Sequence, residues 1–130
     1  MTMEDIPQLP GPTLGVSLVG SVAIYGTGAD TDYIVLVSNQ CEWALDAVQV
    51  ASWRYDGNYS NPDAEFTSLR KDGVNLIVTD KPWLFESFLI ATDIMRRIAH
   101  IAPQHDKIKR VIMYELLRQW CKEAHCEPIL

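Results

Sequence analysis

The stretch Leu18-Val-Gly-Ser-Val-Ala-Ile-Tyr-Gly-Thr-Gly-Ala-Asp-Thr-Asp-Tyr-Ile-Val-Leu-Val37 decides how this chain folds. It sets a Gly-Ser pair before two alternate aspartates, which open a strongly apolar strand. In a strand, residues i and i+2 point to the same face, so Asp30 and Asp32 are expected to present their carboxylates side by side. Adjacent carboxylates repel each other unless a cation lies between them, and their oxygens suit a hard ion such as Mg²⁺ or Mn²⁺.

The Gly-Ser pair upstream adds a second binding element. Gly20 lets the backbone approach a ligand closely, and Ser21 can donate both its N–H and its hydroxyl to a phosphate oxygen. The segment therefore predicts a site for a nucleoside triphosphate and its metal ion. An alternative is a single strand over residues 16–25 followed by a polar turn at 26–32. The metal-binding interpretation is favoured because Gly and Ser are poor choices inside a long strand.

Length and composition predict one domain. The chain has 130 residues, of which 48% are apolar, and four Trp, so it can bury a single core. We expect an N-terminal tail over residues 1–13 and one domain over 14–130. The formal net charge of -6 argues against nonspecific binding along DNA, which relies on clustered Lys and Arg. A small nucleotide remains compatible, because a metal ion neutralises its phosphates.

Cysteine usage and hydropathy bear on the location of the protein. The three cysteines are Cys41, Cys121 and Cys126, an odd number, and no signal-like or membrane-spanning apolar run is present. We therefore expect a reduced, cytoplasmic protein without membrane contact. Cys121, His125 and Cys126 also form a short group of soft ligands, but a zinc site needs a fourth ligand and none is near in sequence.

Periodicity predicts the secondary structure. Apolar runs indicate strands at 16–19, 33–37, 65–70 and 74–78, the last two joined by a hairpin turn at Lys71-Asp72-Gly73. Ser38-Asn39 predicts the cap of a helix over 41–51, in which Trp43, Ala47 and Val50 share a face. Residues 53–63 are rich in aromatic and turn residues and are predicted to form a substrate-facing loop.

Two helices are expected after Lys81. In the first, Leu84, Phe88, Ala91, Met95 and Ile98 recur at i+4 and i+3, and Pro82 suits its first turn. The second is expected over 106–124, with Ile108, Ile112 and Leu116 facing inward. Strands followed by paired helices describe an α/β or α+β fold.

With Gly20-Ser21 and Asp30-Thr31-Asp32 in place, the sequence resembles the nucleotidyltransferase superfamily. The eight-residue spacer between the two motifs is at the short end for that superfamily. The match includes Tyr25-Gly26-Thr27, a small-residue turn before the aspartates. More narrowly, residues 65–80 with Trp83, Phe88 and Ala91-Thr92 resemble small phage-encoded proteins predicted to be nucleotidyltransferases. Together the resemblance covers about residues 16–100.

This resemblance implies a mixed sheet flanked by helices and metal-dependent transfer of a nucleoside monophosphate from a triphosphate to a hydroxyl acceptor. Gly20, Ser21 and Thr27 would contact the nucleotide, as would Arg70, unless Arg70 is merely a solvated residue beside the turn. Asp30 and Asp32 would hold the metal, and a third carboxylate would activate the acceptor hydroxyl. That third position is most simply Asn75, which cannot act as a general base. Asp72 and Asp80, at the two ends of the same expected strand, are the alternatives, although neither has the central position.

The asparagine leaves two functions open. The first is a metal-dependent nucleotidyltransferase with an unnamed acceptor, a small molecule, a protein or an RNA. The second is a catalytically degenerate module that binds a nucleotide or a protein, such as a phage factor acting on a host protein or defence system in the host cytoplasm. A homo-oligomer or a partner protein that completes the site is also left open. The basic residues Arg96, Arg97, Lys107, Lys109 and Arg110 could receive an RNA or a phosphorylated acceptor, but a charged helix surface is the more frequent explanation of such a cluster.

Overall fold

A five-stranded mixed sheet forms the centre of the computed structural model, which describes residues 9, 11–56, 65–99, 101 and 107–126. The strands are β1 (Gly15–Val19), β2 (Thr31–Leu36), β3 (Arg54–Tyr55), β4 (Thr67–Lys71) and β5 (Val74–Thr79). Their order is β1-β2-β5-β4-β3, in which β2 and β5 are parallel and every other neighbouring pair is antiparallel. The helices are α1 (Gly20–Tyr25), α2 (Gln40–Ala51), α3 (Pro82–Arg97) and α4 (Lys107–Cys126).

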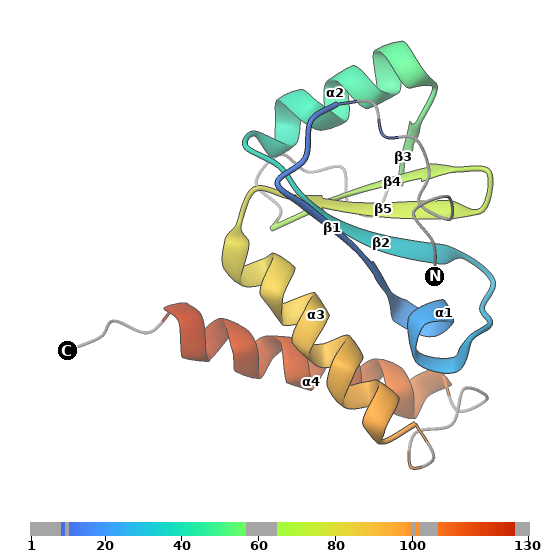
Figure 1. Ribbon diagram of the computed structural model, residues 1–130, viewed down its shortest axis with the longest axis vertical. Helices are drawn as coiled ribbons and strands as arrows, with labels where there is room; N and C mark the ends of the chain where they lie inside the picture. The colour runs from blue at the N-terminus through green and yellow to red at the C-terminus, as the bar shows by residue number, and fades with distance from the viewer. Residues whose placement is uncertain (1–8, 10, 57–64, 100, 102–106, 127–130) are drawn as a thin grey trace.

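The molecule has three layers (Figure 1), with α2 on one face of the sheet and α3 and α4 on the other. The α2 face holds a core cluster that includes Tyr33, Val35, Trp43, Trp53 and Leu76. The opposite face holds a second cluster made of Val19, Ile34, Ile77, Leu84 and Phe88. A mixed sheet flanked by helices, with two helices at the C-terminal end, confirms the expected fold class.

Helix α2 begins at its expected cap. The Asn39 side chain accepts a hydrogen bond from the Glu42 backbone N–H at 3.0 Å. The placement of Val50 on the buried face is wrong, since this residue is 82% exposed. The middle of the buried face is set by Ala44 and Ala47, and Val50 lies about a quarter turn away from it.

The hairpin between β4 and β5 is confirmed at the expected turn. Asp72 and Gly73 have φ angles of 51° and 78°, which is the left-handed pair that a two-residue hairpin requires. This turn fixes the register of the two strands, so that Arg70 lies opposite Asn75.

Helix α3 buries the expected stripe of Leu84, Phe88, Ala91 and Met95. The inward placement of residues on α4 is wrong. Ile108, Ile112 and Leu116 are 76%, 53% and 64% exposed. The reason is that α4 turns its other face, which carries Tyr114 and Cys121, toward α3 and the sheet.

The described part of the N-terminal segment lies against α2. The indole nitrogen of Trp43 donates a hydrogen bond to the Pro12 carbonyl at 3.0 Å, and Leu9 packs against the core cluster on this face. Of the loop expected at 53–63, Trp53 is buried and Arg54–Tyr55 forms the edge strand β3, while residues 57–64 lie outside the described residues.

Candidate functional site

Three polar side chains stand at one level across neighbouring strands. Asp32 on β2 lies directly opposite Asn75 on β5, and Asn75 lies opposite Arg70 on β4. Two residues further along β2 and β5 are Ile34 and Ile77, which belong to the core cluster under α3. Because residues two apart share a face of the sheet, this polar row lies on the α3 and α4 side.

Asp32 is the acid of this row, and it is half-buried. The Asn75 side-chain nitrogen donates to Asp32 Oδ1 at 3.2 Å, and the Ser68 hydroxyl donates to Asn75 Oδ1 at 2.5 Å. Burial raises the pKa of Asp32, and the nearby Asp30 charge raises it further, although the Asn75 hydrogen bond and the Arg70 charge oppose these effects. A cation bound beside the Asp32 carboxylate, in addition to the Arg70 guanidinium, would therefore stabilise its charged form.

Asp30 lies just before β2 and is held by Arg70. The Arg70 guanidinium donates to Asp30 Oδ2 at 2.7 Å and to Asp56 Oδ2 at 3.0 Å, so it bridges two carboxylates. Asp30, which is expected to bind the metal ion, is thus one of the two ion-pair partners of Arg70 in this structure. A role in holding phosphate would require Arg70 to release Asp30.

Gly20 at the start of α1 fits its position for a specific steric reason. Its φ angle is +73°, and a Cβ atom added to it would collide with the Asp32 carboxylate. The glycine therefore lets the backbone of the β1–α1 turn lie directly against the acid on β2. This brings the two motifs of the sequence into one site.

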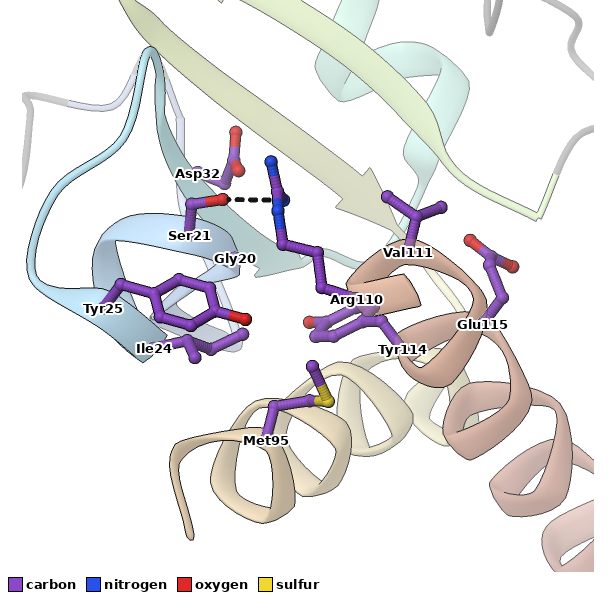
Figure 2. Close-up of a pocket in the computed structure, with 10 residues that line it drawn as sticks. All are labelled: Gly20, Ser21, Ile24, Tyr25, Asp32, Met95, Arg110, Val111, Tyr114 and Glu115. Carbon is purple, nitrogen blue, oxygen red and sulfur yellow. Dashed lines mark hydrogen bonds between the residues drawn. The ribbon is translucent and has the colours of Figure 1, made fainter. Parts of the chain in front are cut away.

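A cavity of about 180 Å³ opens beside this turn (Figure 2). Gly20, Ser21 and Asp32 line it together with Arg110 from α4, whose guanidinium donates to the Ser21 hydroxyl oxygen at 3.1 Å. Its apolar walls are Ile24, Tyr25, Met95, Val111 and Tyr114. Burial raises the pKa of Tyr25, and the Arg110 charge opposes this shift, as expected for a guanidinium near the phenol.

Arg110 is a candidate site residue that the sequence did not single out. It stood within a basic cluster, and the available signal was its i+4 spacing to Tyr114 on one face of α4. Thr27, by contrast, is exposed on the loop between α1 and β2 and does not line this cavity. Elsewhere in the basic cluster, Arg97 pairs with Asp93 at 3.2 Å on the outer side of α3.

A magnesium ion that arrives with a nucleotide would fit this donor set. Asp30 and Asp32 offer carboxylate oxygens and Ser21 offers a hydroxyl, and Mg²⁺ is commonly held by one or two carboxylates, substrate phosphates and water. No group of three His, Cys, Asp or Glu side chains suited to a metal ion occurs within the described residues. The carbonyl oxygen of Asn75 already accepts a hydrogen bond from Ser68.

The cysteines lie outside this site. Cys41 is exposed and Cys121 is buried, and both are free thiols. The side chains of His125 and Cys126 lie outside the described residues. Within the part of the chain that the structure describes, no helix is long and apolar enough to cross a membrane.

Comparisons with known proteins give a distant structural likeness. The crystal structure of the conserved protein GrpB from Enterococcus faecalis matches with 15% sequence identity and a TM-score of 0.46, over 88% of this chain and 84% of that chain. No family model matches the sequence, and no curated protein matches it. The function proposed below therefore depends on the geometry of the polar row and the cavity.

Proposed function

We propose that this protein binds the polyphosphate of a nucleoside triphosphate together with one Mg²⁺ ion. The observation that carries the proposal is the meeting of the Arg110 guanidinium and the Ser21 hydroxyl, 3.1 Å apart, in a cavity that Asp32 also lines (Figure 2). Both groups can donate hydrogen bonds to phosphate oxygens, and a guanidinium suits phosphate geometry. Asp32 and Asp30 would hold the ion against the same phosphates.

The electrostatics of the row support binding with a metal ion. The half-buried Asp32 carboxylate has a raised pKa and is repelled by the Asp30 charge, and a bound cation would relieve both effects. Arg70 satisfies Asp30 when no ligand is bound, which keeps the acid pair stable in the free protein. When the nucleotide and Mg²⁺ bind, the Arg70–Asp30 ion pair would be replaced by a bond between Asp30 and the metal ion.

The same row disfavours transfer chemistry. Asn75 occupies the position directly opposite Asp32, and an amide does not accept the proton of an acceptor hydroxyl. The amide instead donates to Asp32, which fixes the orientation of that carboxylate. The chain therefore has the groups that bind a nucleotide, with an asparagine where the resemblance implies the third acid.

A second candidate function is nucleotidyl transfer, and one observation favours it. Asp56 shares the Arg70 guanidinium with Asp30, so a third carboxylate lies near the pair. If Arg70 withdraws when a nucleotide binds, Asp56 could take the role of the missing acid. The acceptor would then be a compound that carries a hydroxyl group.

Calorimetry tests the binding function directly. The protein is titrated with ATP, GTP, CTP and UTP, each with and without Mg²⁺. At least one nucleotide is expected to bind only with the ion, and Arg110→Met should weaken that binding by about tenfold or more, since a charge-assisted hydrogen bond to phosphate is lost. Arg97→Met is the matched control, because Arg97 pairs with Asp93 away from the cavity. Absence of binding by all four nucleotides would overturn the proposal.

Release of pyrophosphate separates the two candidates. The binding function predicts no release by the natural sequence with Mg²⁺ or Mn²⁺. Release that disappears in the Asp30→Asn, Asp32→Asn double variant supports transfer instead, and its loss in Asp56→Asn alone identifies Asp56 as the third acid. In Asn75→Asp a carboxylate replaces the amide beside Asp32. This variant is expected to bind the ion more tightly.

A further inference from the structure

A second cavity, of about 210 Å³, lies on the same face of the sheet as the first. Its walls come from β4, β5, α3 and α4, and they include Phe66, Ser68, Asn75, Ile77 and Phe88. Asn75 lines this cavity, while Asp32, to which it donates a hydrogen bond, lines the other. The two cavities are therefore neighbours that meet at the Asp32–Asn75 pair.

The Glu115 carboxylate lines both cavities, and the other polar groups differ. In the first, Ser21 and Arg110 offer donors that suit phosphate oxygens, beside the Asp32 carboxylate. In the second, the Ser68 hydroxyl and the Asn75 amide offer both donors and acceptors. A mixed set of this kind matches a heterocycle that carries both ring acceptors and amino or carbonyl groups.

The charges of the second cavity are compensated within the protein. Its two guanidinium groups belong to Arg70, which pairs with Asp30 and Asp56, and to Arg118, which contacts both carboxylate oxygens of Glu115 at 2.7 and 2.8 Å. Little positive charge is left to attract a second phosphate group. This disfavours an anionic occupant and favours a neutral one.

Planar surfaces surround the same space. The rings of Phe66 and Phe88 lie nearly perpendicular with centroids 6.1 Å apart, and the Arg118 guanidinium lies 4.4 Å from the Phe88 centroid. Aromatic rings and guanidinium planes are the surfaces on which nucleobases stack.

We propose that the second cavity binds the nucleobase of the triphosphate whose phosphates occupy the first. This inference rests on the proposed function, and it places the ligand across the Asp32–Asn75 pair with the metal-binding acids between its two ends. The tyrosines of the first cavity are the competing site for the base. Of these, Tyr114 is already engaged, since its hydroxyl bonds to Thr92 at 2.8 Å and its ring packs on Phe88 at 5.9 Å.

Tripolyphosphate, which has phosphates and no base, tests this placement. Calorimetry with Mg²⁺ compares it with the tightest-binding of the four nucleoside triphosphates. Phe66→Ala should weaken nucleotide binding by about tenfold, which is typical of a lost base–aromatic stack, and leave tripolyphosphate binding within about twofold. Tyr25→Ala, which alters the first cavity, is the matched variant and should not discriminate between the two ligands in this way.

The unaltered protein gives an independent measurement, because each cavity contains an isoleucine. Methyl NMR of Ile24 reports on the first cavity and that of Ile77 on the second. The nucleotide is expected to shift both signals and tripolyphosphate only that of Ile24. Nucleotide shifts confined to Ile24, or equal losses of both ligands in Phe66→Ala, would overturn the base site alone. If tripolyphosphate does not bind, the polyphosphate site itself is wrong.

Discussion

The two faces of the sheet are built for different purposes. On the α2 face, Tyr33, Val35 and Leu76 pack against Trp43 and Trp53, and all five side chains are at least nine-tenths buried. On the α3 and α4 face, the apolar cluster is interrupted by the polar row and by two cavities. The comparison indicates that one face is packed for stability, while the other carries a half-buried acid and open space, as the proposed binding of a ligand requires.

The largest effect is expected from truncating the α2 face. Trp43→Ala removes an indole that is 7% exposed and that donates to the Pro12 carbonyl. A loss of about 3–5 kcal/mol in the free energy of unfolding is expected from the cavity and the lost hydrogen bond. Urea unfolding followed by far-UV circular dichroism measures it. The folded fraction should still bind Mg²⁺–nucleotide normally, and a loss below about 1 kcal/mol would contradict the division between the faces.

A smaller loss in the free energy of unfolding is expected from Gly20→Ala, at the turn between β1 and α1. Gly20→Ala combines a left-handed backbone with a collision against Asp32, and should cost about 1–3 kcal/mol and weaken nucleotide binding. Gly26→Ala is the matched control, because Gly26 has a φ angle of +85° and open space around its Cβ position. The difference between the two variants in thermal unfolding isolates the contact with Asp32. Equal losses, with nucleotide binding intact in both, would show that Gly20 has only a backbone role.

The sequence predicted the parts of this arrangement that depend on local chemistry. The Gly-Ser turn, the alternate acids and the Asp72-Gly73 hairpin each follow from short-range rules, and the hairpin fixed the position of Asn75. The strand register places Asn75 directly opposite Asp32.

The orientation of α4 was not predictable in the same way. This helix carries apolar residues on two sides, so periodicity alone does not decide which side is buried. The stripe of Ile108, Ile112 and Leu116 faces outward because the side with Tyr114 packs on Phe88 and bonds to Thr92. The same rotation directs Arg110 to Ser21, a contact across 89 positions of sequence that only the tertiary fold creates.

The smallest expected change in stability comes from Asp32→Asn, which replaces one carboxylate oxygen by an amide nitrogen and tests stability and metal-dependent binding separately. Burial raises the folded-state pKa of Asp32 above its unfolded value, so its contribution to stability is present at acid pH and is lost as pH rises through the raised pKa. At pH 7 the buried charge is therefore a cost, and Asp32→Asn should raise the Tm by on the order of a few degrees while removing the Mg²⁺ dependence of nucleotide binding. The gain should shrink as pH falls through the raised pKa of Asp32, and it should be absent below the ordinary aspartate pKa of about 3.9, where both the folded and the unfolded parent protein are protonated at this position. Asp93→Asn, which alters an exposed partner of Arg97, is the control that should not reproduce it. A lower Tm in Asp32→Asn at neutral pH would mean that Asn75 and Arg70 compensate the buried carboxylate fully, and that this face is as stable as the other.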